Sequence, residues 1–319
     1  MALRCALLDD FQHAALDHAD WSPIADQVEL VPFRDHFGSE EELATALADF
    51  DIVITLRERV AFPASLFERL PRLRLLVASG MRNSVIDLAA AERHGVTVCG
   101  TASSSQPPVE LTFALLLGLA RQLVPENAAL RAGGPWQGSV GTDLHGRCLG
   151  LLGLGQIGTR VARIALAFGM RVVAWSPNLT AERAAAAGVE LAGSKEELLA
   201  AADFVSIHLK LGERSRGLLG AAELALLKPT AYLVNTSRAA IVDQDALLAA
   251  LHEGAIAGAG LDVFDLEPLP ADHPLRSAPR LLATPHLGYV THDNYRTYYG
   301  QAVEDIQAFL AGAPVRRLS

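Results

Sequence analysis

The chain has 319 residues, of which 50% are hydrophobic and 20% are charged, and its formal net charge is −9 at pH 7. This length exceeds what one hydrophobic core usually serves and favours two domains, while the apolar content excludes a disordered chain. The negative charge disfavours a nucleic-acid partner, because a duplex binder needs a basic face that displaces counterions.

Neither a membrane span nor a secretion signal is expected. The longest apolar run, residues 111–120, stops at Arg121 and is shorter than the ~20 residues needed to cross a bilayer. The N-terminus reaches Asp9 and Asp10 before an apolar segment or a cleavage site can form. We therefore predict a cytoplasmic protein with no membrane partner.

The cysteine pattern indicates neither a disulfide framework nor a metal site. Cys5, Cys99 and Cys148 are odd in number and lack CxxC spacing, which argues against disulfides and against a zinc site. We expect three buried, apolar cysteines and no metal.

The N-terminal part alternates strand and helix patterns. Residues 39–50 begin with a serine cap and acidic residues in the first turn, which is typical of a helix. Strands that alternate with helices predict a parallel sheet covered by helices. The predicted strands are residues 4–8, 28–33, 51–55, 73–78 and 96–99.

A long helix is predicted over residues 109–122, directly after Pro107 and Pro108, with Glu110 in its first turn. It is apolar almost all round, so it must be buried in the core or against another subunit. Residues 131–146 break the periodicity and are predicted to form a loop.

A second alternation of strands and helices follows and extends to about residue 288. The final segment, residues 292–311, is amphipathic and is expected to pack on an earlier part of the chain. The predicted strands are 148–152, 171–175, 204–208, 231–235, 257–263 and 281–284, and the predicted helices are 156–168, 180–187, 194–201 and 244–253.

A glycine-rich turn follows the first strand of this second half. Gly153 permits a tight turn, Gly155 lets the backbone approach a pyrophosphate, and Gly158 allows close packing of helix and strand. The helix that begins at Gln156 and Ile157 then directs free N–H groups at the phosphates. The pattern predicts dinucleotide binding; the alternative is a tight turn of any doubly wound fold.

The end of the next strand leaves the form of the dinucleotide open. An acidic residue is typical there when the adenosine ribose carries a free 2′-hydroxyl. Ser176 holds that place, followed by Pro177 and Asn178, and the nearest cation along the chain is Arg183. Serine can bind a ribose or a phosphate, so NAD and NADP both stay possible.

Three later segments place polar residues after predicted strands: Arg238, the pair Asp262 and Glu267, and His286. Ligands of open parallel sheets bind outside the carboxyl ends of the strands. Each residue alone is more often structural or solvated, but together, beside a dinucleotide turn, they indicate an active site.

The chain resembles the D-isomer-specific 2-hydroxyacid dehydrogenase family over nearly its whole length. The resemblance rests on LGLLGLGQIG (149–158), LVNTSRAAIVD (233–243), AGLDVFDLEPLP (259–270) and ATPHLGYVT (283–291). It implies hydride transfer between NAD, with NADP not excluded, and a small 2-oxo or D-2-hydroxy acid.

The resemblance also implies roles for individual residues. Arg238 matches the arginine that binds the substrate carboxylate and carbonyl, His286 the acid/base, and Glu267 the carboxylate paired with it. Glu267 argues against the formate dehydrogenase branch, which has glutamine there. The cofactor-binding positions are Gly153, Gly155, Gln156, Ile157, Gly158, Ser176, His208, Thr236, Asp262 and Gly288.

The family's substrate loop matches residues 77–83, so Ser79, Gly80 and Met81 are expected to bind substrate, the first two through backbone N–H groups. Arg82 either binds a second acidic group or faces solvent at a helix start. The chain differs from the family pattern at several positions, so the motifs do not identify the side chain of the substrate. These positions are Met81, Arg82, Asn83, Ser103 to Gln106, Lys210 and Ala239.

These observations predict an α/β protein with two doubly wound parallel-sheet domains. Residues 1–99 and 289–319 would form a discontinuous, flavodoxin-like substrate domain, and residues 100–288 an inserted Rossmann dinucleotide domain. The resemblance also implies a homodimer, with the helix at 109–122 and the loop that follows it as the interface. A corepressor-like, nicotinamide-sensing binding protein of the same fold is the alternative function.

Overall fold

A computed structural model describes residues 2–319. The chain divides into two compact units, which are described separately. Unit 1 comprises Met1–Ser104 and Val290–Ser319, and unit 2 comprises Ser105–Tyr289. Unit 2 is thus inserted into unit 1, and both crossings lie within a few residues of the boundaries that the sequence predicts.

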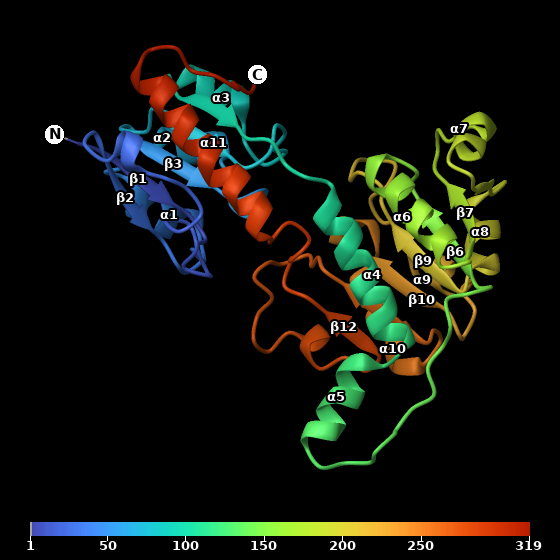
Figure 1. Cartoon of the computed structure of the whole chain (residues 1–319). Helices are drawn as coiled ribbons and strands as arrows, with labels where there is room; N and C mark the ends of the chain where they lie inside the picture. Colours follow the sequence, from blue (N-terminus) through green and yellow to red (C-terminus); the bar gives the residue numbers. More distant parts are fainter. Residues whose placement is uncertain (1) are drawn as a thin grey trace. The chain divides into compact units, whose positions relative to one another are not determined.

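Unit 1 contains a five-stranded sheet in the order β2-β1-β3-β4-β5, in which every pairing is parallel. This is the flavodoxin-like order, with its topological switch point between β1 and β3. The strands are β1 (Leu3–Leu7), β2 (Val28–Pro32), β3 (Ile52–Thr55), β4 (Leu75–Ala78) and β5 (Thr97–Gly100), and the helices are α1 (Glu40–Leu47), α2 (Ala64–Glu68), α3 (Leu88–Arg93) and α11 (His292–Leu310) (Figure 1).

Local sequence patterns explain why most of these helices and strands could be predicted from the sequence. Every residue of β3 and β4 is buried, as a central parallel strand requires. Ser39 caps α1 by accepting a hydrogen bond from the N–H of Glu42. The five strand predictions are confirmed to within two residues, whereas α2 and α3 were missed because five or six residues are too few for a helical periodicity to show.

Helix α11 completes unit 1 from the far end of the sequence. Its side chains Tyr298, Tyr299 and Ile306 are buried, and Trp21 of the N-terminal segment packs against Tyr299. The expectation that the last segment packs on an earlier part of the chain is confirmed.

Unit 2 contains a seven-stranded parallel sheet in the order β12-β11-β10-β9-β6-β7-β8. Its strands are β6 (Cys148–Leu152), β7 (Arg171–Trp175), β8 (Glu190–Leu191), β9 (Phe204–Ile207), β10 (Tyr232–Asn235), β11 (Gly258–Leu261) and β12 (Leu281–Ala283). Its helices are α4 (Gln106–Ala120), α5 (Leu123–Arg131), α6 (Gln156–Ala167), α7 (Ala181–Ala186), α8 (Lys195–Ala201), α9 (Ala221–Leu224) and α10 (Gln244–Glu253) (Figure 1).

Helices cover both faces of this sheet. Leu233 of β10 packs in one hydrophobic cluster and the next residue, Val234, packs in another. Successive side chains of a strand point to opposite faces, so each cluster is one face of the sheet. After β6 the chain adds β7 and β8 on one side of that strand, and then crosses to add β9 on its other side. The strand order therefore reverses between β6 and β9, and ligands of open parallel sheets bind at such a switch point.

The long apolar helix differs from its prediction at both ends. α4 begins at Gln106, because Pro107 and Pro108 fit the first turn, where no N–H is required. Glu110 therefore lies beyond the first turn, and the expected dipole contact there is wrong. Gln122, with φ 51°, adopts a left-handed conformation and ends the run, after which the unpredicted α5 begins.

The described residues, 2–319, contain no single helix long and apolar enough to cross a membrane. Helices α4 and α5 reach that length only as a pair, across a bend of 62°. The three cysteines are free and buried, as predicted.

Candidate active site

The glycine-rich turn lies at the carboxyl end of β6, at the switch point of the sheet. Gly153 has φ 106°, and a Cβ there would lie 2.7 Å from the carbonyl oxygen of His208. A Cβ on Gly158 would lie 2.1 Å from the carbonyl oxygen of Gly153. Both positions therefore require glycine, one for its backbone conformation and the other for close packing.

Gly155 serves a different purpose in the same turn. It caps α6, and a Cβ built there would meet nothing within 4 Å. The space is open, as a cradle for a ligand would be, while the N–H groups of Gln156, Ile157 and Gly158 begin the helix without intrahelical partners. This geometry fits the pyrophosphate of a dinucleotide.

His208 follows β9 and lies beside the glycine-rich turn. Its Nε2 shares a hydrogen bond of 2.9 Å with the hydroxyl of buried Ser206. Burial lowers the pKa of His208 to about 4, so the ring is neutral at pH 7. His208 therefore lies beside the glycine-rich turn as a neutral side chain, and its contact with a cofactor stays a prediction.

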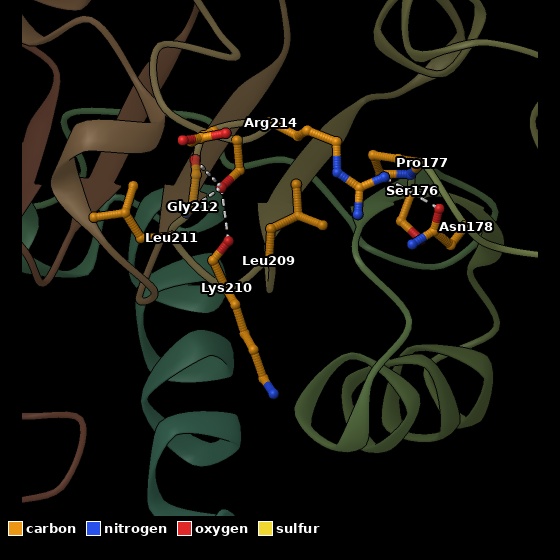
Figure 2. Close-up of a pocket in the computed structure, with 10 residues that line it drawn as sticks. Ser176, Pro177, Asn178, Leu209, Lys210, Leu211, Gly212 and Arg214 are labelled. Carbon is orange, nitrogen blue, oxygen red and sulfur yellow. Dashed lines mark hydrogen bonds between the residues drawn. The ribbon is translucent and has the colours of Figure 1, made fainter. Parts of the chain in front are cut away.

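A hollow of about 500 Å³ lies beside the end of β7 (Figure 2). It is lined on one side by residues 176–178 and on the other by the segment after β9, residues 209–215. Ser176 thus lines a hollow, and its contact with the adenosine ribose stays a prediction. Arg183, the cation nearest to it along the chain, reaches instead toward the carbonyl of Leu154 at 3.4 Å.

His286 and Glu267, which lie 19 positions apart in the chain, form a close pair. His286 Nδ1 lies 2.5 Å from Glu267 Oε2, and Glu267 Oε1 accepts a hydrogen bond from the N–H of Phe264 at 2.8 Å. The side chains of His286 and Glu267 keep 21% and 26% of their surface exposed, so a small molecule can reach them. His286 also packs edge-on against Tyr289.

Asp262 organises the loop that carries His286. Its carboxylate is 1% exposed and accepts hydrogen bonds from the Thr284 hydroxyl at 2.7 Å, the Leu287 N–H at 2.7 Å and the Gly288 N–H at 2.8 Å. Burial raises the pKa of Asp262, while these bonds and the charge of His286 act against that rise. Asp262 and Gly288 therefore bind each other; their contact with a cofactor stays a prediction.

Asn235, at the end of β10, shapes the turn that presents Arg238. Its fully buried side chain accepts from the Ser237 N–H at 3.0 Å and donates to the Arg238 carbonyl at 2.9 Å. In the same turn, the Thr236 hydroxyl lies 3.0 Å from that of Thr112 on α4. The backbone of the turn is thus held from both sides, and Arg238 Nη1 donates to the Ser237 carbonyl at 2.7 Å.

The predicted substrate loop of unit 1 is held by hydrogen bonds within that unit. The Ser79 N–H donates to the Thr55 carbonyl and the Gly80 N–H to the Thr101 hydroxyl, both at 3.1 Å. Both amides are therefore engaged within unit 1 in this structure, and their contact with a substrate carboxylate stays a prediction. The Ser79 N–H is engaged because residue 79 still continues the hydrogen-bond ladder of β4.

A cation that sequence analysis missed lies on this loop instead. Arg57 donates from Nη1 to the Ser79 carbonyl at 3.2 Å, and a Cβ on Gly80 would lie 2.2 Å from that nitrogen. Asn83 donates to the Arg57 carbonyl at 2.8 Å, which holds the loop closed on itself. Met81 and Arg82 are exposed.

The comparison with known proteins agrees with the geometry of unit 2. The NAD-binding domain of the D-isomer specific 2-hydroxyacid dehydrogenases matches residues 113–288. The chain belongs to this family. Membership gives it an NAD-binding domain and makes it a nicotinamide-dependent oxidoreductase of 2-hydroxy acids, and the corepressor-like alternative is not favoured.

Among the relatives of this dehydrogenase is the glyoxylate reductase of Aeropyrum pernix, 38% identical over 85% of this chain and 83% of that protein. The D-3-phosphoglycerate dehydrogenase of Bacillus subtilis is 35% identical over 91% of this chain; the chain spans about half, 54%, of that protein's length. A phosphoglycerate oxidoreductase structure from Vibrio cholerae superposes with a TM-score of 0.92 at 34% identity and covers 98% of this chain and 100% of that one.

Sequence reasoning missed several residues that contact the candidate site residues within each unit: Arg57 in unit 1, and Asn235, Thr284 and Arg214, which donates to Asn178 at 3.3 Å, in unit 2. Asn235 stands in the quoted motif, and its full burial at a strand end is the signal that marks it as a turn-shaping residue. Arg57 and Arg214 carry no local signal, because their partners lie 22 and 36 residues away.

Proposed function

We propose that this dehydrogenase interconverts a 2-oxo acid and the corresponding D-2-hydroxy acid with Arg238, His286 and Glu267 as its catalytic residues. The observation that carries the proposal is the contact between His286 Nδ1 and Glu267 Oε2, on a partly exposed loop at the carboxyl edge of the sheet. A histidine held by a carboxylate in this way is suited to general acid–base catalysis.

In this proposal His286 exchanges a proton with the substrate through Nε2. Glu267 binds Nδ1, which fixes the orientation of the ring and leaves Nε2 for the substrate. The charged ring donates a proton to the 2-oxo oxygen during reduction, and the neutral ring accepts it back during oxidation. The bound nicotinamide supplies or accepts the hydride.

Arg238 binds the substrate carboxylate and the carbonyl oxygen. A guanidinium offers several donors in one plane, which matches the two acceptors of a 2-oxo acid. The buried side chain of Asn235 supports this role, because it fixes the backbone on which Arg238 stands. Pre-oriented donors reduce the cost of aligning the substrate for the reaction.

We also propose unit 2 as the dinucleotide domain and unit 1 as the substrate domain. The cradle at Gly155 supports the first assignment. Arg57 supports the second assignment, because its guanidinium lies against the backbone of Ser79 and Gly80. It offers positive charge where the expected amides of Ser79 and Gly80 are engaged.

A homodimer is part of this proposal. In unit 2, α5 and the loop after it extend away from the sheet (Figure 1). This arm exposes apolar side chains that a monomer would leave in water: Leu123 is 54% exposed, Leu130 54%, Trp136 81% and Val140 98%. A second copy of the chain would cover them.

The test of the activity is a panel of 2-oxo acids assayed with NADH and NADPH. Glyoxylate, pyruvate, hydroxypyruvate and its 3-phosphate share the carboxylate and the 2-oxo group and differ only in the group on the other side of the carbonyl, so the panel reports which substituent the enzyme accepts. Oxidation of the reduced cofactor with at least one of them supports the proposal. Failure of purified, dinucleotide-binding protein to reduce any 2-oxo acid would contradict it.

A further inference from the structure

A cation from a distant loop lies beside the end of β7. Arg214, in the segment after β9, donates a hydrogen bond from Nη1 to the Asn178 side-chain oxygen at 3.3 Å. Figure 2 shows its side chain extending across the hollow toward Ser176, Pro177 and Asn178, while Lys210 points elsewhere. The guanidinium therefore lies next to the residue that follows the second strand of the nucleotide fold.

That position decides which dinucleotide a Rossmann domain prefers. A carboxylate there binds the two ribose hydroxyls of NAD and repels a 2′-phosphate, whereas an arginine accommodates the phosphate. Here the strand ends in Ser176, Pro177 and Asn178, which offer hydroxyl and amide groups and no negative charge. The hydroxyl of Ser176 can donate to a phosphate oxygen.

We propose that Arg214, Ser176 and Asn178 form a binding site for the 2′-phosphate of NADP(H), so that this enzyme binds NADP(H) more tightly than NAD(H). The proposal deepens the dinucleotide site described above and rests on it. Arg214 is the specificity-determining residue, since it supplies a charged donor directed at the hollow.

The other charged groups around the hollow are consistent with Arg214 as the group that binds the 2′-phosphate. The lining contains two cations, Lys210 and Arg214, and one acid, Glu213, so its formal charge is positive. Arg183 reaches toward the Leu154 carbonyl, within the glycine-rich turn, and is suited to the pyrophosphate. Asn178 holds Arg214 only through a neutral amide oxygen, which a phosphate can replace at little cost.

The experiment measures binding without turnover, by calorimetry with 2′,5′-ADP and 5′-AMP as probes. The two differ by the 2′-phosphate alone. We expect the wild-type protein to bind 2′,5′-ADP about 10- to 100-fold more tightly than 5′-AMP, which corresponds to one or two charge-assisted hydrogen bonds. Dissociation constants for NADPH and NADH should differ in the same direction.

Two variants and a control locate the effect. Arg214→Gln should remove most of the difference between the probes, and Ser176→Asp should reverse it by placing a carboxylate at the ribose. Arg216→Gln, a nearby exposed arginine outside the lining, should keep the wild-type difference. Circular dichroism confirms that each variant is folded.

The outcomes separate this inference from the proposed function. Equal affinity of the wild-type protein for the two probes, or the same loss in the Arg214 and Arg216 variants, would overturn the 2′-phosphate site while leaving the dinucleotide site intact. Binding of neither probe would instead overturn the dinucleotide site itself, and the inference with it.

Discussion

The Nδ1 atom of His286 lies 2.5 Å from Oε2 of Glu267, and the other oxygen of that carboxylate accepts the N–H of Phe264. The carboxylate is therefore anchored to the backbone on one side and to the ring on the other. A ring held at Nδ1 has one nitrogen left for the substrate, Nε2, and its orientation does not have to be established during the reaction.

Replacing His286 with glutamine should abolish acid–base catalysis in both directions. We expect kcat to fall by about 10²- to 10⁴-fold, which is the usual contribution of a positioned proton donor. The dissociation constant for the reduced dinucleotide, measured by fluorescence, should stay close to wild type. His252→Gln, on the exposed side of α10, is the matched control; near-normal turnover of the His286 variant would refute the mechanism.

The two directions of the reaction should respond oppositely to pH. Reduction uses the charged form of His286 and should decline as pH rises, whereas oxidation uses the neutral form and should increase. Glu267→Gln removes the carboxylate that holds Nδ1 of the ring, so we expect kcat to fall in both directions while the dissociation constant for the reduced dinucleotide stays close to wild type. Wild-type turnover in this variant would argue against a role for the carboxylate.

The glycines of the dinucleotide turn should separate folding from binding. Gly158→Ala forces a Cβ against the Gly153 carbonyl at 2.1 Å and should lower the free energy of unfolding by about 1–3 kcal/mol. Gly155→Ala meets nothing within 4 Å, so it should keep the wild-type Tm while weakening dinucleotide binding. Thermal unfolding and calorimetry measure the two effects; unchanged dinucleotide affinity in the Gly155 variant would contradict the assignment of the cradle.

Asp305 should make unit 1 less stable as pH rises. Its side chain is fully buried on α11, and burial raises its pKa from 3.8 to about 7, although Arg316 at 3.0 Å opposes the shift. Between these values the folded state holds a proton that the unfolded state releases, so the free energy of unfolding falls by about 1 kcal/mol per pH unit from pH 4 to pH 7. Above pH 7 this contribution is lost.

Denaturant unfolding from pH 4.5 to pH 8 checks this sign. Asp305→Asn should flatten the dependence, because an amide does not titrate. Asp293→Asn removes an exposed carboxylate at the other end of α11, where it binds Arg296 at 3.1 Å, and should leave the slope unchanged. Equal slopes in the wild type and the Asp305 variant would show that this group does not titrate with unfolding.

The apolar arm after α4 should control the oligomeric state. Leu130→Asp together with Val140→Asp places charges on two exposed apolar positions, and we expect a dimer in sedimentation to become a monomer at micromolar concentration. Leu226→Asp, also exposed but on a different part of unit 2, should leave the dimer intact. A wild-type monomer would exclude this interface.

Much of the fold was readable because its signals are local. Strands such as Cys148–Leu152 and helices such as Gln244–Glu253 agree with their predictions residue for residue. The apolar run of a buried strand, the N-cap aspartate at 243 and the C-terminal Gly254 are all contained in the segments they define. Short elements such as β8 and α9, with two and four residues, carry too little pattern to be predicted.

The sequence by itself determined the alternation of strands and helices, the glycine-rich turn and the residue types of the active site. Only the tertiary structure decided which groups meet: Asp262 with Gly288, Arg57 with Ser79, and Arg214 with Asn178. The reason is physical. Backbone conformation depends on near neighbours in the chain, whereas the partner of a side chain depends on the order in which the strands pair, and parallel pairing joins segments that are far apart in sequence.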